Sequence, residues 1–121
     1  MTQEEINDYN RMCAEFLGYE YISKDLHPQA YENYGWWVKG TYTNNIDARN
    51  NLNWKGFNSS LKFHSDWNWI MKIIEKILDV CLNLDSMEMY YNITDAIPEQ
   101  HKVMQAINQF LIWYNNENNK R

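Results

Sequence analysis

The stretch 63–81 constrains the fold most, because it is the longest segment of the chain with a helical pattern of apolar residues. One apolar face repeats at the three-and-four spacing of an α-helix. It consists of Trp67, Ile70, Ile74, Ile77 and Cys81. A second apolar row runs beside this face and leaves only a narrow polar strip. Ser65 or Asp66 can cap the N-terminus of the helix. A helix of this kind must be buried on two or more sides, so we expect the rest of the chain to pack around it.

The length of the chain indicates one domain, because 121 residues are too few to build two substantial cores. Hydrophobic residues make up 45% and charged residues 22%, as in an ordinary globular protein. The last seven residues, 115–121, are polar and low in complexity. We therefore expect a single domain over 1–114, followed by a fraying helix end or a polar tail over 115–121.

The charge of the chain excludes some classes of partner. A formal net charge of −5 disfavours nucleic acid polymers and anionic membranes, because both need a cationic protein surface. The acidic N-terminus has no apolar signal segment, and no apolar run approaches the ~20 residues of a membrane span. These features predict a cytoplasmic protein without a membrane partner. Cys13 and Cys81 lie on apolar helical faces, which favours two buried, reduced thiols over a disulfide or a reactive pair.

The first part of the chain predicts a helix followed by two strands. Residues 2–17 combine a capping box formed by Thr2 and Glu5, an apolar face, and Gly18 at the position that ends a helix. Residues 19–23 alternate as a strand does. Residues 34–43 predict a second strand, in which Trp36 and Trp37 fall on opposite faces.

The remaining part of the chain predicts a loop, a strand and a helix around 63–81. The asparagine-rich stretch 44–60 indicates a long ordered loop, and alternation over 84–93 favours a third strand. Pro98 opens a third helix with an apolar stripe that extends to Tyr114. The expected fold is therefore α+β, with the order α-β-β-α-β-α and a small antiparallel sheet of about three strands. Apolar groups on both sheet faces favour a helix–sheet–helix sandwich.

No motif in the sequence indicates catalysis. The three histidines, His27, His64 and His101, lie in different predicted elements, and none has a second ligand at metal-binding spacing. No phosphate-binding glycine loop and no nucleophile elbow occurs. We therefore predict no catalytic residues, no metal site and no cofactor, although a site assembled in space from distant residues would leave no such motif.

Aromatic residues indicate a ligand site, because their content of 16%, with six Trp and nine Tyr, exceeds the ordinary need of a core this small. Flat aromatic faces suit base stacking or protein hot spots, and asparagine amides can read a base edge. The alternative is that most of these rings only build the core. The expected ligand-binding residues are Trp36, Trp37, Trp54, Lys55, His64 and Trp67.

The run LKFHSDWNWIMKIIEKI at 61–77 resembles a segment of small uncharacterised proteins of bacteriophages and prophages, frequent in Bacteroides-like hosts. The stretch VMQAINQFLIWYNNENN at 103–119 and the opening AEFLGYEY at 14–21 are similar to the same proteins. Trp67, Trp69, Glu75, Trp113 and Tyr114 match their pattern. The resemblance covers about two thirds of the chain, leaves 24–60 unmatched, and carries no catalytic residues over. It implies the helix–sheet–helix fold of phage ABA-sandwich proteins and a location in the host bacterial cytosol.

Three functions are open at this point. The first is a non-catalytic phage or mobile-element accessory protein that binds and sequesters a small ligand, for which a nucleotide signal of host antiviral defence is one candidate. The second is a protein-binding inhibitor of a host defence protein. The third is a small phage enzyme with a spatially assembled site. A homo-oligomer is compatible with all three, because an apolar sheet or helix face can exceed what the helices cover.

Overall fold

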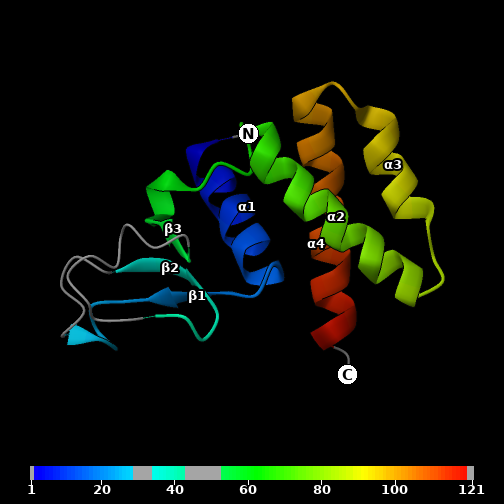
Figure 1. The fold of residues 1–121 in the computed structure, drawn as a ribbon. Coiled ribbons are helices and arrows are strands. Elements are labelled where there is room, and N and C mark those ends of the chain that lie inside the picture. The colour runs from blue at the N-terminus through cyan, green and yellow to red at the C-terminus, as the bar shows by residue number, and fades with distance from the viewer. Residues whose placement is uncertain (1, 29–33, 43–52, 120–121) are drawn as a thin grey trace. The chain divides into compact units, whose positions relative to one another are not determined.

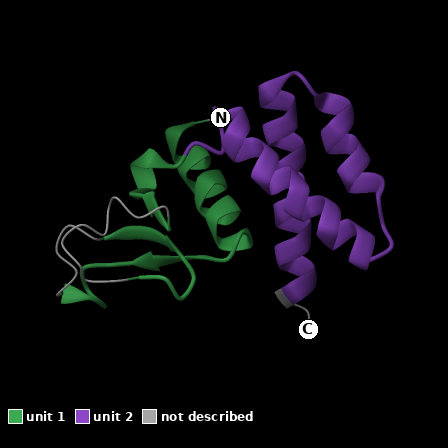
Figure 2. Ribbon diagram, in the orientation of Figure 1, with its two compact units in different colours: residues 1–61 green, residues 62–121 purple. Residues whose placement is uncertain are grey.

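The structure, a computed structural model, describes residues 2–28, 34–42 and 53–119. Within these ranges the chain is α+β, with four α-helices and a three-stranded antiparallel sheet, which confirms the expected fold class (Figure 1). It divides into two compact units, residues 1–61 and 62–121 (Figure 2). Each unit is described below by itself. The expected limits of a single domain at 1–114 stay a prediction.

The first unit begins with α1 (Gln3–Phe16), whose two ends follow the local chemistry of the sequence. The Thr2 hydroxyl accepts from the backbone N–H of Glu5 at 3.2 Å, and the Glu5 carboxylate accepts from the backbone N–H of Thr2 at 3.1 Å. This reciprocal pair is the predicted capping box. At the other end, Gly18 has a φ of +82°, and its N–H donates to the Glu15 carbonyl. Both predicted ends of the helix are confirmed.

The sheet contains the strands β1 (Tyr19–Ile22), β2 (Gly35–Val38) and β3 (Trp54–Gly56) in that spatial order, all antiparallel. The first two lie in the predicted segments 19–23 and 34–43. The third lies in the stretch 44–60, for which the sequence predicts a loop, so that prediction is wrong for Trp54–Gly56. Residues 43–52 of that stretch lie outside the described residues. The expected order α-β-β-α-β-α is therefore wrong, because all three strands precede the second helix.

Tryptophan builds both faces of this sheet. Trp37 packs with Ile22 on one face, and Tyr34, Tyr42 and Trp54 surround this pair. Trp36 lies on the opposite face, where its ring is 5.3 Å from that of Tyr21, its partner across the β1–β2 pair. Apolar groups on both faces of the sheet are thus confirmed. The first unit places α1 against β1, while the complete helix–sheet–helix sandwich stays a prediction.

The second unit begins with α2 (Trp67–Asn83), the helix expected from 63–81. Asp66 is its N-cap and accepts from the backbone N–H of Asn68 at 2.8 Å, so Asp66 rather than Ser65 makes this bond. Its buried side chains recur every three to four residues, as predicted. They are Ile70, Ile73, Ile74, Ile77 and Cys81.

The prediction of a strand over 84–93 is wrong, because this stretch contains the helix α3 (Glu88–Ala96). The alternation of Met87, Met89 and Tyr91 spans too few residues to separate a period of two from a period of 3.6. Ile93 is the buried residue of this helix, and α3 packs against α2 and the last helix. The strand pattern was therefore overridden by packing between helices.

The last helix, α4 (Gln100–Asn119), extends five residues beyond the predicted apolar stripe. The stripe is confirmed at Val103, Ile107 and Phe110, which are fully buried, as is Leu111 beside them. Tyr114, at the end of the stripe, is partly buried. The side-chain amide of Gln100 donates to the Ser65 carbonyl at 3.3 Å, which ties the start of α4 to the residues before α2. The expected polar tail is thus helical as far as Asn119.

Candidate functional site

Trp36 and Trp37, two of the expected ligand-binding residues, are side chains of the core. Trp36 is 4% exposed, and its indole N–H donates to the Asn58 side-chain oxygen at 2.6 Å. Trp37 is fully buried, and its ring lies 5.6 Å from that of Tyr42, edge to face. Both rings pack within the protein, so neither offers an open face for stacking. The expectation that most tryptophans serve the core describes these two residues.

Trp54 and Lys55 lie on β3 and are both partly buried. The Trp54 indole N–H donates to the Tyr34 carbonyl at 3.1 Å, and its ring meets Phe57 edge to face at 5.3 Å. The Lys55 ammonium lies 5.8 Å from the centre of the Tyr19 ring, within the range of a cation–π contact. These contacts hold both side chains to the sheet. Their role in ligand binding stays a prediction.

His64 and Trp67, the other two expected residues, belong to the second unit, at the start of α2. Both are partly buried, and Asp66 between them occupies the helix N-terminus as its cap. The carboxylate of Asp66 therefore already meets the positive end of the helix dipole. The six expected residues thus divide between the two units, and neither unit by itself brings them together.

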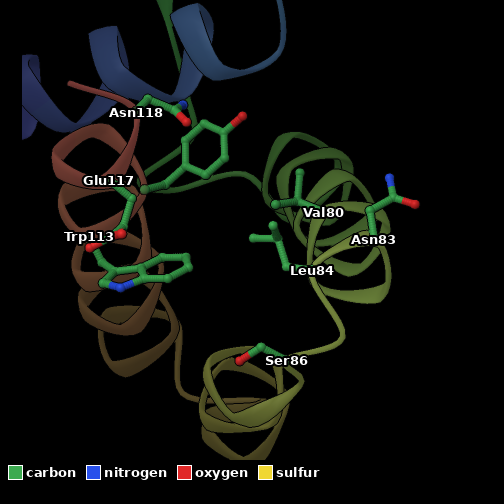
Figure 3. Close-up of a pocket in the computed structure, with 8 residues that line it drawn as sticks. Val80, Asn83, Leu84, Ser86, Trp113, Glu117 and Asn118 are labelled. Carbon is green, nitrogen blue, oxygen red and sulfur yellow. The ribbon is translucent and has the colours of Figure 1, made fainter. Parts of the chain in front are cut away.

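A cavity of about 390 Å³ lies within the second unit, at the C-terminal ends of α2 and α4 (Figure 3). Its walls come from the end of α2, the turn after it, and the last two turns of α4. The lining residues are Val80, Asn83, Leu84, Ser86, Trp113, Tyr114, Glu117 and Asn118. The Trp113 ring extends from α4 towards Leu84 at the end of α2 (Figure 3).

The turn after α2 shapes one wall of this cavity. Leu84 is the C-cap, Asp85 has a left-handed φ of +52°, and the N–H of Ser86 returns to the Cys81 carbonyl at 3.0 Å. The N–H of Asp85 returns to the Leu82 carbonyl at 3.2 Å. These two bonds make a Schellman motif, which ends the helix sharply. The motif places Leu84 and Ser86 on the cavity wall.

Phe110 packs against Trp113 and Tyr114, the two side chains that form the aromatic wall of the cavity. This buried ring lies 5.9 Å from both the Trp113 and the Tyr114 rings, and its plane is inclined by only 17° to that of Tyr114. Packing of this kind restricts the rotamers of the two lining side chains. Trp113 and Tyr114 are only partly buried, so they present ring surface to the cavity.

The chemistry of the lining suits binding rather than catalysis. It combines aromatic and aliphatic surface with two amides, one hydroxyl and the carboxylate of Glu117. Among the described residues, no histidine, cysteine, lysine or arginine lines the cavity. Cys81 lies one turn before the C-cap, where burial raises the pKa of its thiol and keeps it in the unreactive neutral form. A hydrophobic cavity with a few polar groups is typical of small-molecule sites.

A second cavity, of about 470 Å³, lies in the first unit, and the described residues that line it are all of polar or charged type. Its lining comes from α1 and from the 3₁₀ turn η3 (Asn58–Ser60), and includes Asp8 and Arg11. Arg11 pairs with Glu15 at 3.1 Å, and Gln3 donates to Asn7 at 2.9 Å. None of these described lining residues has an aromatic or aliphatic side chain that could bury a ligand, so this cavity is the weaker candidate.

The sequence contains a signal for the larger part of the aromatic wall in the adjacent pair Trp113 and Tyr114. The predicted apolar stripe includes Tyr114, and the resemblance to the phage proteins includes both residues. An adjacent Trp–Tyr pair occupies more than one helical face, so both rings cannot point into the same core contact. The following polar residues, Glu117 and Asn118, then mark the edge of a site rather than a tail.

Two further properties of the described residues bear on function. No group of three or more His, Cys, Asp or Glu side chains in these parts of the chain is arranged to hold a metal ion. None of the helices in the described ranges has the length and apolar character needed to cross a membrane.

Comparison of the chain with protein-family models, curated proteins and solved structures finds no match. The resemblance to phage ABA-sandwich proteins, and the host cytosol it implies, therefore stay predictions.

Proposed function

We propose that this protein binds a small ligand in the cavity lined by Trp113 and Tyr114, and that it acts by capture rather than by catalysis. The observation that carries the proposal is the cavity itself, in which aromatic and aliphatic surface of α4 and α2 faces a common space (Figure 3). Its volume of about 390 Å³ falls within the range of about 300–1,000 Å³ typical of ligand pockets. Its polar groups are few and distinct, which suits orientation of a bound molecule.

A role in capture is also consistent with the side chains that line the cavity, because binding needs no paired nucleophile and base. General acid–base or nucleophilic catalysis needs a nucleophile and a base within hydrogen-bond reach of each other. Ser86 and Glu117 are the lining residues with such groups, and they come from different elements. A protein that sequesters its ligand needs no such pair.

In this proposal the protein serves a phage or mobile element, as the resemblance implies, and removes a small molecule from the host. The candidate ligand suggested by the sequence is a nucleotide signal of antiviral defence. The aromatic wall of the cavity suits stacking against its base. The described residues of the lining include no lysine or arginine to bind its phosphates. Nucleotides and nucleosides therefore belong together in the first screen, because their comparison separates recognition of the base from recognition of the phosphate.

The test is a ligand screen observed by NMR, using the indole N–H signals of the six tryptophans. A ligand of the proposed site shifts the signal of Trp113, and Trp113→Leu abolishes binding while it keeps an apolar side chain. The matched control is Tyr91→Leu, which removes an exposed aromatic ring from α3 outside the cavity. Absence of binding across nucleotides, nucleosides, aromatic acids and aromatic amines, in a folded sample, would contradict the proposal.

A second candidate, the protein-binding inhibitor, is favoured by apolar side chains that the helical unit exposes. Leu82 is 58% exposed and Ile112 is 47% exposed, and Leu84, Tyr91 and Ile97 are also open. With a net charge of −5, such a surface suits a partner with a basic rim around an apolar patch. A host-lysate pull-down with the wild type and Leu82→Glu tests it, because a specific partner is lost in the variant. The same exposed residues would serve self-association, which light scattering measures.

A further inference from the structure

The solvent-facing side of α3 carries an aromatic ring between two carboxylates. Its exposed residues recur at the spacing of one helical face. They form the α3 stripe, which consists of Glu88, Tyr91, Asn92 and Asp95. We propose that the α3 stripe is a docking surface for a basic helical segment of a partner protein. None of its four residues lines the cavity of Trp113 and Tyr114, so this surface is separate from the proposed ligand site.

Tyr91 supplies the apolar part of the stripe. It is 54% exposed, whereas Ile93 on the opposite side of α3 is fully buried. The Tyr91 ring lies 5.9 Å from that of Tyr90, which is partly buried, and Ile97 just after the helix is also exposed. Tyrosine is enriched among the residues that dominate protein interfaces, and its ring face attracts the guanidinium group of arginine. The stripe therefore offers a stacking surface to a basic side chain.

The charge on both sides of Tyr91 has the same sign. Glu88 lies three residues before Tyr91 and Asp95 four residues after it, on the same helical face. From 84 to 98, the charged residues of the chain are Asp85, Glu88 and Asp95. This stretch contains no lysine, arginine or histidine. Charge complementarity therefore favours a cationic partner for this face.

The basic residues of the two helices that pack against α3 are accompanied by carboxylates. At the start of α4, Lys102 follows His101 and pairs with Glu99 at 2.7 Å. The polar strip of α2 has a formal charge of zero, because it holds two lysines and two carboxylates. These residues are Lys72, Glu75, Lys76 and Asp79. By this count, neither group of residues supplies surplus positive charge to offset Glu88 and Asp95.

Asp95 stands at a position that its own helix disfavours. It lies in the last turn of α3, where the helix dipole concentrates partial negative charge, and this turn has no basic residue. Glu88 lies in the first turn, where a carboxylate stabilises the helix. An exposed charge that costs local stability, on the same face as an open tyrosine, indicates a contact with another molecule.

An amphipathic helix with arginine and leucine side chains fits these features. One helical turn is about 5.4 Å long, so a guanidinium group on the Tyr91 ring lies within reach of the Glu88 or the Asp95 carboxylate. Such a contact combines a cation–π interaction with a charge-assisted hydrogen bond. Leucines of the same segment can cover Ile97 and the edge of the Tyr91 ring, as apolar anchors do in helix recognition.

The probe is a designed peptide of about 18 residues, or five helical turns, with leucine along one face and arginine along the other. It is titrated into the full-length protein at low ionic strength and neutral pH, and the backbone N–H signals are followed by NMR. We expect the largest shifts at Glu88, Tyr91 and Asp95, and weaker binding as salt is added. A second peptide, with glutamate in place of every arginine, should not bind.

Glu88→Gln combined with Asp95→Asn should weaken binding of the arginine peptide about fivefold, as the loss of two exposed ion pairs would give. The matched control combines Glu4→Gln with Asp8→Asn. It removes two exposed carboxylates from one face of α1 and changes the net charge by the same amount. This control should leave the affinity within about twofold of the wild type.

Asp95→Asn by itself separates docking from folding. It should raise the melting temperature, because it relieves the unfavourable charge at the end of α3, and it should also weaken peptide binding. A residue with a merely structural role would not give changes of opposite sign. Tyr91→Ala should weaken binding further, since it removes the stacking surface.

Four results would overturn the proposal. The first is equal weakening by the α1 control pair, which would mean that the peptide responds only to net charge. The second is equal binding of the glutamate peptide, and the third is a set of shifts that leaves out the α3 stripe. The fourth is a shift of the stripe with protein concentration alone, which would identify a second copy of the chain as the occupant. Each result leaves the ligand screen at Trp113 unaffected, so the two proposals fail separately.

Discussion

Thr2 and Glu5 show how much two residues at a helix start can determine. Each accepts a backbone hydrogen bond of the other, so the first turn of α1 is closed by local chemistry. The backbone N–H of Thr2, and next its hydroxyl, hold the pKa of the Glu5 carboxyl below its ordinary value. A depressed folded-state pKa stabilises the fold above the pKa of the unfolded chain. That contribution is lost as the pH falls through the lower folded value.

Thr2→Ala should therefore raise the pKa of Glu5 towards its ordinary value, because the hydroxyl is removed and the first turn frays. A carbon-detected NMR titration of the Glu5 carboxyl measures the change. Glu99 is the internal control, since its pKa is lowered by the hydrogen bond and charge of Lys102 in the other unit. A Glu5 pKa that stays depressed in Thr2→Ala would show that the backbone N–H of residue 2 holds it without help from the hydroxyl.

Both cysteines should be unreactive in the native protein. Cys13 and Cys81 are buried free thiols, and burial raises the pKa of each. The thiolate is the reacting form, so a raised pKa and a lack of access act together. Ellman's reagent should find almost no thiol in the folded protein and both thiols in denaturant. Rapid reaction of one thiol without denaturant would place that cysteine at an accessible surface.

Gly35 is a residue whose side chain would break a contact between strands. It has a φ of +125°, and a Cβ atom there would lie 2.6 Å from the Gly56 carbonyl oxygen on β3. Gly35→Ala should destabilise the protein by about 2 kcal/mol or more, because backbone strain and a clash with main chain add. Denaturant unfolding measures the loss.

Gly40→Ala is the matched control, because Gly40 also has a positive φ, +79°, but open space around it. Gly40→Ala should lower the free energy of unfolding by only about 1 kcal/mol, the cost of holding alanine at a positive φ. Equal losses for the two variants would mean that the approach of β3 to Gly35 does not limit the sheet.

At the scale of the element, the helix ends are better specified than the strands. α1 and α2 carry N-caps in the sequence, Thr2 and Asp66, and both caps are present in the structure. These bonds join residues two or three positions apart, so sequence is sufficient to predict them. A strand, in contrast, exists only with its partner. Trp54–Gly56 pairs with β2, about twenty positions earlier, and its own three residues hold no signal of that pairing.

Asp85 makes a prediction at the end of α2. It has a left-handed φ of +52°, a conformation that glycine adopts more easily, and its negative charge opposes the helix C-terminus. Asp85→Gly should stabilise the protein by about 1 kcal/mol, measured as a shift in the denaturant midpoint.

Asp85→Asn separates the two contributions, because asparagine removes the charge and still tolerates the left-handed region. It should give a smaller gain than glycine, while Asp85→Ala should give none or a loss. A loss of stability in Asp85→Gly would show that this carboxylate makes a stabilising contact that outweighs the conformational term.

The whole molecule carries more acidic than basic groups, and this controls how copies of it behave together. The formal net charge is −5 at pH 7, and the isoelectric point is about 5.1. Repulsion between copies should therefore keep the protein dispersed at neutral pH and vanish near the isoelectric point. The exposed apolar side chains of the helical unit, such as Leu82, then become available for association.

We expect light scattering to rise as the pH approaches about 5 and to fall again on either side. Leu82→Glu should lower the scattering at its maximum, because it adds charge and removes an apolar contact. Leu26 in the other unit is 77% exposed. Leu26→Glu therefore tests whether association arises specifically from the helical unit. Light scattering that does not change with pH would mean that charge repulsion does not govern association.

The candidate site shows where sequence reasoning stops. The aromatic surplus predicts that tryptophan takes part in ligand binding, but it does not separate the buried Trp36 and Trp37 from the partly exposed Trp113. All three are flanked by apolar or aromatic residues in the chain. The difference arises because Trp36 and Trp37 lie in the central strand of a sheet, while Trp113 lies in the last two turns of α4.

Local chemistry was enough to predict the α+β class, the helices α1, α2 and α4, and the first two strands. Helix caps, glycines and short apolar periods act within a few residues, so a single stretch of sequence contains them. Packing between distant segments decided the rest. It made 88–96 a helix against α2 and α4, recruited Trp54–Gly56 as the third strand, and brought Leu84 opposite Trp113. Such contacts join residues far apart in sequence, and their free energy depends on partners that no single stretch of the chain contains.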